Sequence, residues 1–164
     1  MQCVLKRISE RDRPTVMKKS NATKTQSTET ITPFDRLVYL AALSIPKSKV
    51  CTYGDLAAAI GKKGAARAVG SSLARNPYAP EVPCHRIVRK GGHLAGYQGK
   101  TKDLALKKKS KMLATEKVAF KDNGSVRDSS FVGVREIKDK LAKSSKSYLS
   151  ANRKLEKIIR EKSR

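Results

Sequence analysis

Three adjacent residues, Cys84, His85 and Arg86, form the densest group of reactive side chains in the sequence. A cysteine attacks carbon as the thiolate, and a free thiol with a pKa of roughly 8.5 is only slightly ionised at neutral pH. A neighbouring imidazole can take the thiol proton, directly or through a water, and the Arg86 guanidinium adds positive potential that favours the anion. A packed cysteine beside a hydrogen-bonded histidine fits the same triplet, so both interpretations stay open on these residues alone.

The other cysteines and histidines indicate neither a metal site nor a disulfide framework. Cys3, Cys51 and Cys84 contain no CxxC pair, and His93 is the only other histidine. No ligand spacing typical of zinc results. Three unpaired cysteines are typical of a reduced, intracellular protein.

Local sequence signals predict three short helices ahead of the Cys84 segment. The first begins at Thr32, a good N-cap, with Pro33 at the first helical position, and it ends before Pro46. Residues 53–60 and 65–75 predict two more, joined by a glycine-containing turn with two lysines. This pattern is typical of a DNA-binding helix-turn-helix, and an ordinary helical hairpin fits it equally well.

The following segments predict two brief extended pieces and a fourth helix. Residues 50–52 and 87–88 read as extended, and residues 102–117 read as a lysine-loaded helix. The expected anchors of that helix are its three leucines, Leu104, Leu106 and Leu113.

The two ends of the chain differ in texture from this central part. Residues 18–31 are rich in Ser, Thr and Lys, which predicts a flexible linker. Residues 133–161 predict one final helix with an apolar stripe broken at Ser144. A solvated helix and a helix that lies on DNA or binds a protein partner both fit this stripe. We therefore expect a flexible segment 1–31, a domain 32–118 and a basic extension 119–164.

The charge of the chain points to a polyanionic partner. Lys and Arg number 37 against 14 Asp and Glu, a formal charge of +23. Nucleic acid is the leading partner class, and an anionic membrane surface is second. No apolar run approaches the ~18 residues of a membrane span, so we expect no membrane protein. Apolar residues make up 38% and aromatic residues 5%, enough for a modest core.

A series of short motifs resembles one known family. The chain is similar to the C-terminal, DNA-binding domain of the 6-O-methylguanine-DNA methyltransferases. The motifs occur in the family's order: Ile45-Pro46, Thr52-Tyr53-Gly54, Ala66-Arg67-Ala68-Val69-Gly70, Asn76-Pro77, Pro83-Cys84-His85-Arg86-Ile87-Val88, Gly96-Tyr97, and Leu113 with Glu116.

The resemblance implies a mainly α fold: a small helical domain with a winged-helix-like helix-turn-helix, short strands around the active-site loop, and flexible basic extensions at both ends. It implies binding of double-stranded DNA in the minor groove and flipping of an alkylated guanine. A groove only ~6 Å wide demands small side chains. Arg67 would fill the hole left by the base, and Tyr53 would rotate the phosphate. The implied DNA contacts are Tyr53, Ala65, Ala66, Arg67, Ala68, Gly70 and Arg86.

The resemblance also implies roles in catalysis. Cys84 would take the alkyl group irreversibly, His85 would remove the thiol proton through a water, and Glu116 would orient His85. Asn76 would tie the recognition helix to the active-site turn. No cofactor is needed, because the DNA supplies the alkyl group. The implied substrate contacts are Tyr53, Val88, Tyr97 and Gln98.

Several positions depart from the family pattern. Ser48 stands where a glycine is usual and strains a turn, Gln98 replaces a serine, and the spacing from Tyr97 to Glu116 is longer. Only ~33 residues precede the first predicted helix, so we expect the family's N-terminal domain to be missing.

Two other functions stay open beside alkyl transfer. One is a non-catalytic, alkyltransferase-like protein that binds alkylated bases and recruits repair factors; the other is a chromatin-like DNA binder that acts through charge alone. We expect a monomer, in the nucleus of a eukaryote or the cytoplasm of a prokaryote. The lysine run 107–111 fits a nuclear signal or, within a folded helix, a DNA-facing edge.

Overall fold

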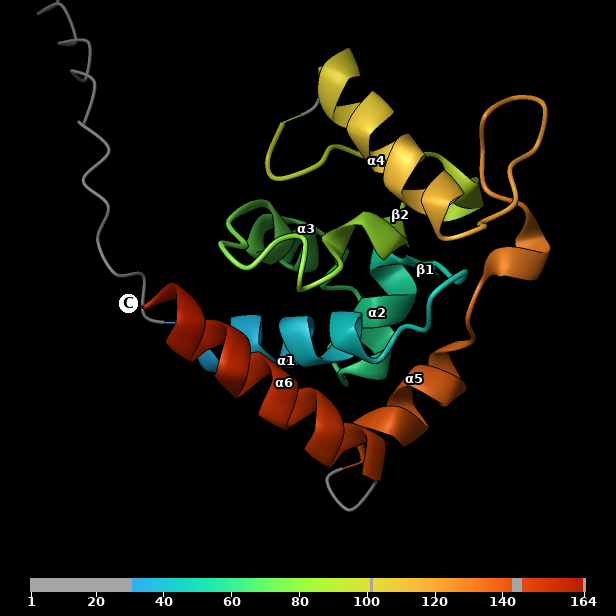
Figure 1. The fold of residues 1–164 in the computed structure, drawn as a ribbon. Helices are drawn as coiled ribbons and strands as arrows, with labels where there is room; N and C mark the ends of the chain where they lie inside the picture. The colour runs from blue at the N-terminus through green and yellow to red at the C-terminus, as the bar shows by residue number, and fades with distance from the viewer. Residues whose placement is uncertain (1–30, 101, 143–145, 164) are drawn as a thin grey trace, which may run out of the picture. The chain divides into compact units, whose positions relative to one another are not determined.

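The computed structural model describes residues 31–100, 102–142 and 146–163 (Figure 1). The predicted linker 18–31 lies outside these ranges except for its last residue. Six α-helices and one two-stranded sheet make up the regular structure of the described residues. The chain is therefore mainly α, as predicted.

The three predicted helices ahead of Cys84 are confirmed as α1 (Pro33–Leu43), α2 (Tyr53–Ala59) and α3 (Ala66–Ala74). Thr32 and Thr52 cap α1 and α2 in the same way. Each threonine hydroxyl accepts a hydrogen bond from the backbone N–H three residues later, at 3.1 Å for Asp35 and 3.0 Å for Asp55. The caps satisfy backbone donors that the first turn would leave without partners.

A short parallel sheet joins the start of α2 to the Cys84 segment. Strand β1 (Cys51–Thr52) pairs with β2 (Ile87–Val88), with Cys51 opposite Ile87. Helix α2 begins directly after β1, and a 3₁₀ turn at Cys84–Arg86 directly precedes β2. The pairing therefore brings residues more than thirty positions apart into one site.

Helix α4 (Asp103–Thr115) turns a lysine, rather than a leucine, toward the core. Leu113 is fully buried as predicted and Leu106 is half-buried, but Leu104 is 80% exposed, so its predicted anchoring role is wrong. Lys109 is fully buried instead. Lys109 and Leu113 are four residues apart and share the inward face, while Leu104 lies roughly 140° around the helix from Lys109.

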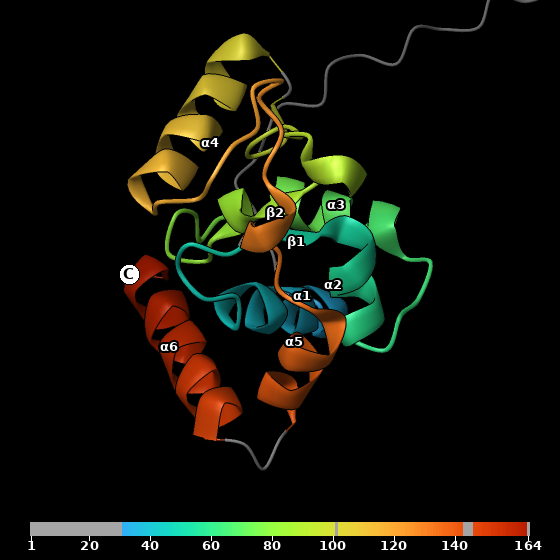
Figure 2. The ribbon, with the colours of Figure 1, turned by 90° about the vertical axis from the view of Figure 1, so that its right-hand side faces the viewer.

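The prediction of a single helix over residues 133–161 is wrong. The structure has two helices, α5 (Val134–Leu141) and α6 (Lys146–Lys162), and the backbone of Ala142 leaves the helical region at φ −57°, ψ 124°. One unbroken helix of that length would extend about 40 Å and could not lay both halves on a small domain. The break lets α5 pack on α1 and α2, and α6 on α1 (Figure 2). The buried apolar residues of this pair are Ile137, Ala151, Leu155 and Ile158.

Polar contacts also fasten α6 to the rest of the domain. The Arg36 guanidinium on α1 donates to the Asn152 amide oxygen at 2.8 Å and pairs with the Glu156 carboxylate. Near the other end of α6, Lys162 pairs with Glu81 at 3.4 Å. The basic extension is thus part of the packed structure.

The segment between α4 and α5 is pinned to the turn after β2. The Val126 N–H donates to the Gly92 carbonyl at 3.0 Å, and Gly92 has a φ of +81°. A Cβ atom at position 92 would lie 2.6 Å from the Val126 carbonyl oxygen. Only glycine fits both the backbone conformation and this close approach.

No helix within the described ranges is long and apolar enough to cross a membrane.

Candidate active site

Cys84 lies at the wall of a cavity of about 200 Å³. The residue opens the 3₁₀ turn before β2 and is 5% exposed. The start of α2, the inner face of α3 and the loop 96–99 supply the other walls. The lining residues are Tyr53, Gly70, Leu73, Ala74, Cys84, Gly96, Gln98 and Gly99.

The environment of the Cys84 thiol combines two opposing effects. Burial raises its pKa, and the positive charge of Lys109 and a hydrogen bond with Asn76 lower it enough to offset only part of that rise. The sequence suggested that Arg86 would supply the positive potential; in the structure Lys109 supplies it. Cys51, by contrast, is fully buried, and burial followed by the Asp55 charge raises its pKa to about 12. Cys84 is therefore the better nucleophile of the two described cysteines.

Lys109 is the functional residue that sequence reasoning missed. Its ammonium group donates a hydrogen bond of 2.5 Å to the carbonyl oxygen of Ile87, just after the active-site turn. Burial, opposed by Cys84 and helped by the charge of Arg89, lowers its pKa to about 8. The four-residue spacing from Lys109 to Leu113 was the available signal, hidden in a run of lysines.

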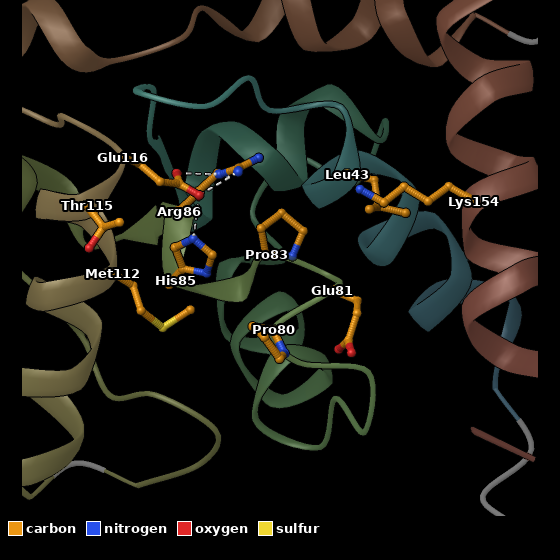
Figure 3. A pocket seen from close by; sticks show the side chains of 10 residues that line it. All are labelled: Leu43, Pro80, Glu81, Pro83, His85, Arg86, Met112, Thr115, Glu116 and Lys154. Carbon is orange, nitrogen blue, oxygen red and sulfur yellow. Dashed lines mark hydrogen bonds and ion pairs between the residues drawn. The ribbon is translucent and has the colours of Figure 1, made fainter. Parts of the chain in front are cut away.

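His85, which follows Cys84 in the chain, is buried and pairs with the half-buried Glu116 (Figure 3). His85 Nε2 lies 3.1 Å from Glu116 Oε1. Burial works to raise the pKa of Glu116, but hydrogen bonds from Arg86 and His85 outweigh it and lower the pKa overall. Glu116 is thus a carboxylate at neutral pH and can only accept, so the shared proton belongs to Nε2 of His85.

This arrangement leaves Nδ1 of His85 as a free base. Burial, its largest cause, lowers the pKa of His85, so the imidazole is neutral at pH 7. Because Nε2 carries the proton, Nδ1 does not. Nδ1 is buried and has no hydrogen-bond partner among the described residues. A buried imidazole with one bare nitrogen is suited to accept a proton from the neighbouring thiol.

The Arg86 side chain points inward and binds Glu116. It is 11% exposed. Nε and Nη2 donate to the two carboxylate oxygens of Glu116 at 2.8 and 2.6 Å, and Nη1 donates to the Ile45 carbonyl at 2.7 Å. This inward geometry does not fit the predicted DNA contact of Arg86 and replaces it with the positioning of Glu116.

Asn76 links the end of α3 to the segment that leads into Cys84. Its amide nitrogen donates to the Val82 carbonyl at 3.3 Å, and its amide oxygen accepts from the Tyr78 N–H at 2.9 Å. The side chain is buried. This is the position that the resemblance implied for it.

Two tyrosines lie close to the thiol. Tyr53, the first residue of α2, lines the cavity, and burial followed by the charge of Cys84 raises its pKa. Burial, then the charges of Cys84 and Glu81, raise the pKa of Tyr97 to about 12. Both phenols therefore keep their protons at neutral pH and can donate hydrogen bonds.

The predicted substrate contacts divide into two groups. Gln98 lines the cavity, in the left-handed conformation with a φ of +50°, and Tyr97 precedes it. Val88 is fully buried in a second apolar cluster with Val50 and Leu113, and it is absent from the cavity wall. The prediction that Val88 contacts the substrate does not fit this position, because β2 turns it away from the cavity.

The exposed face of α3 carries the small residues that the sequence singled out. Arg67 and Ala68 are exposed, and Ala65, Ala66 and Gly70 are half-buried. A Cβ atom at position 70 would touch the Tyr53 ring at 3.8 Å. The α3 surface therefore meets the cavity at Gly70.

Ser48 shows the backbone strain that its sequence position predicted. It adopts a φ of +66°, in the left-handed region, and its hydroxyl donates to the Glu116 carbonyl at 2.6 Å. The hydrogen bond offsets part of the strain and fastens the residue that holds His85.

A second cavity, of about 380 Å³, lies on the His85 and Glu116 side of the site (Figure 3). Glu81 and Pro83 come from the segment before Cys84, and Lys154 reaches it from α6. The extension therefore forms part of the wall beside the His85–Glu116 pair.

Comparison with known proteins finds similar sequences and solved structures. The family model described as the DNA binding domain of 6-O-methylguanine DNA methyltransferase matches residues 33–118. A methylated-DNA–protein-cysteine methyltransferase of Salmonella typhimurium is 50% identical over 68 residues, covering 42% of this chain and 40% of that protein. The namesake from Mycobacterium leprae is 43% identical over 86 residues, covering 52% and 49%. A crystal structure of the Mycobacterium tuberculosis O6-methylguanine methyltransferase shares 42% identity over 52% of this chain and 49% of that one, with a TM-score of 0.46.

The match thus spans half or less of the curated relatives' length. The family match over residues 33–118 includes the Cys84 turn, the His85–Glu116 pair and α3, which together make up the site described above. The chain belongs to the family of the 6-O-methylguanine DNA methyltransferase DNA-binding domain.

Proposed function

We propose that this protein repairs double-stranded DNA by transferring the alkyl group of 6-O-alkylguanine to the sulfur of Cys84. The observation that carries the proposal is the pairing of Glu116 with buried His85, the residue that directly follows Cys84. It fixes the histidine tautomer so that Nδ1 is bare, in the residue that directly follows a cysteine lining a cavity. Nucleophile, base and orienting carboxylate are the three parts of an activated nucleophile.

In the proposed step, His85 Nδ1 takes the thiol proton, directly or through a water. The Cys84 thiolate attacks the alkyl carbon as the bond from that carbon to guanine O6 breaks. The electron pair of the broken bond leaves with guanine, and the Tyr53 hydroxyl donates a hydrogen bond to the departing base. Lys109 stabilises the thiolate before the attack.

The product is a thioether, so Cys84 is consumed and each molecule acts once. The DNA supplies the alkyl group, and the step balances without a cofactor. The reaction is a stoichiometric transfer, in which acceleration comes from positioning and thiol activation.

We assign the approach to DNA to α3 within a domain of residues 32–118. Ala66, Ala68 and Gly70 keep the helix narrow enough for a minor groove ~6 Å wide. Arg67 projects from the same helix and would enter the base stack when the guanine flips out. Gly70 belongs to this surface and also lines the cavity that contains Cys84.

Intact-mass spectrometry tests the proposal. The protein is incubated with a duplex carrying 6-O-methylguanine, and a single increase of about 14 Da, one methyl group replacing one hydrogen, is expected at Cys84. Cys84→Ala should show no increase, and Cys51→Ala should react normally. Selective, tight lesion binding without a mass change would instead favour the non-catalytic, recruiting function.

A further inference from the structure

A lysine-lined groove opens beside the active-site cavity. Its volume is about 980 Å³, and it lies between the loop that starts at Tyr97 and the first three turns of α4. Five of its nine lining residues are lysines, and none is acidic. The lysine groove is formed by Tyr97, Gln98, Lys100, Lys102, Leu104, Ala105, Lys107, Lys108 and Lys111.

The lysine run of α4 is divided between two tasks. Lys109 points inward to the active-site turn, whereas Lys107, Lys108 and Lys111 face outward into the lysine groove. Lys107 and Lys111 are four residues apart and share one face of the helix. Within the described ranges none of the five groove lysines forms an ion pair. Five unneutralised ammonium groups around one concave surface form a strong anion site.

The lysine groove shares a wall residue with the active-site cavity. Gln98 lines both spaces. Tyr97 lines the lysine groove, and the charge of Cys84 contributes to the raised pKa of its phenol. The Lys108 ammonium group lies 5.6 Å from the centre of the Tyr97 ring. A nucleotide whose base enters the cavity keeps its flanking phosphates at the rim. The lysine groove therefore begins where a strand would leave the cavity.

We propose that the lysine groove binds the phosphate backbone of the DNA strand that carries the flipped base, on one side of the lesion. This inference rests on the proposed function, since it takes the cavity to receive a base. It adds to α3 a second contact surface, which holds one flank of the damaged strand by charge. A bound strand would relieve the repulsion among the lysines and release counterions.

The test uses Lys102→Gln/Lys107→Gln/Lys111→Gln in the full chain. Lys108 is kept because it contacts Tyr97. The matched control is Lys138→Gln/Lys146→Gln/Lys157→Gln, which removes the same charge from exposed positions on α5 and α6. Affinity for a lesion-bearing duplex is measured against salt concentration. The slope of log K against log[salt] should fall in magnitude by about 2 to 3 for the groove variant and by less than about 1 for the control.

Duplexes shortened on one flank locate the contact. Removing the flank on one side of the lesion should weaken binding of the unaltered protein and leave the groove variant nearly unchanged; removing the other flank should weaken both alike. Equal slope losses in the two triple variants, or no dependence on flank, would overturn the proposal. So would a groove variant that loses affinity for single-stranded RNA and keeps it for the duplex.

The outcomes separate this inference from the proposed function. Alkyl transfer from free 6-O-methylguanine base requires no strand, so the groove variant should react with it at the rate of the unaltered protein. If the unaltered protein transfers no alkyl group at all, the proposed chemistry fails. The salt slopes and flank dependence still decide whether the lysine groove binds DNA.

Discussion

His85 Nε2 and Glu116 Oε1 lie 3.1 Å apart although 31 positions separate the two residues in the chain. The 3₁₀ turn places one residue and the C-terminal end of α4 places the other. Arg86 holds both oxygens of the same carboxylate, so Glu116 has little freedom to turn away. The longer spacing from Tyr97 to Glu116 is therefore compatible with a formed pair.

Glu116→Gln should slow alkyl transfer by on the order of 100-fold, because a neutral amide no longer fixes the histidine tautomer. Single-turnover rates with a lesion-bearing duplex measure the loss. Glu81→Gln is the matched control, since Glu81 lines the same cavity and pairs with Lys162 instead of His85. Equal rates for both variants would show that the pair does not orient the base.

The acid limb of the transfer rate should lie below pH 6.5, the ordinary pKa of a histidine. Burial lowers the pKa of His85, so the imidazole stays unprotonated, and able to act as a base, down to more acidic pH. The Glu116 charge raises the same pKa, so Glu116→Gln should move the limb lower still while reducing the plateau. Rates between pH 4.5 and 8 test both directions. A limb above pH 6.5 would contradict the buried neutral histidine.

Lys109→Met should make Cys84 a weaker nucleophile near neutral pH. The Lys109 charge lowers the pKa of the thiol, so its removal raises that pKa and moves the pH dependence of thiol alkylation upward. Iodoacetamide labelling of Cys84, followed by mass spectrometry over a pH series, reads this shift without DNA. Lys107→Met, two residues away and exposed, should leave the profile unchanged. An unshifted Lys109→Met profile would remove Lys109 from thiol activation.

Asn76→Ala should destabilise the fold by about 1–3 kcal/mol, because its loss leaves the buried Tyr78 N–H without a partner and removes one of the two hydrogen bonds that the Val82 carbonyl accepts. Asn123→Ala is a close control. Asn123 accepts a hydrogen bond from the N–H two residues later, as Asn76 does, but in an exposed turn. Denaturant unfolding should show a small effect for Asn123→Ala. Equal losses would mean that the buried position of Asn76 adds nothing.

Leu155→Ala should cost about 2–5 kcal/mol of unfolding free energy, because Leu155 on α6 is fully buried in the main core. Leu149→Ala on the same helix removes a leucine that is 47% exposed and should cost less than about 1 kcal/mol. Deletion of residues 125–164 should therefore prevent stable folding as well as remove positive charge. A folded, active truncated protein would show that α5 and α6 are dispensable.

Local signals in the sequence were sufficient for the elements that short-range chemistry determines. Thr32 with Pro33, and Thr52 ahead of α2, define helix starts through caps that involve only three or four residues. Cys84 with His85 marks the site because two reactive side chains stand next to each other.

The features that the sequence did not reveal depend on contacts between distant segments. No glycine or proline near Ala142 signals a helix end, and the apolar spacing continues past this residue. The break between α5 and α6 therefore follows from packing on α1 and α2. Lys109 is surrounded by lysines, so nothing local shows which one turns inward. The resemblance implies a DNA contact for Arg86, and no local signal shows its pairing with Glu116, which lies 30 positions away.

Gly92 offers a caution for reading mutational scans of this protein. Its backbone has a positive φ, and a Cβ atom at position 92 would lie 2.6 Å from the Val126 carbonyl oxygen, so no other residue fits there. Nearly every substitution there should register as loss of function, although position 92 lies outside the cavity wall. Substitutions at this contact between two segments should lower the amount of folded protein, whereas substitutions of Cys84 should abolish alkyl transfer in folded protein. Dividing the repair signal by the protein level would distinguish the two effects.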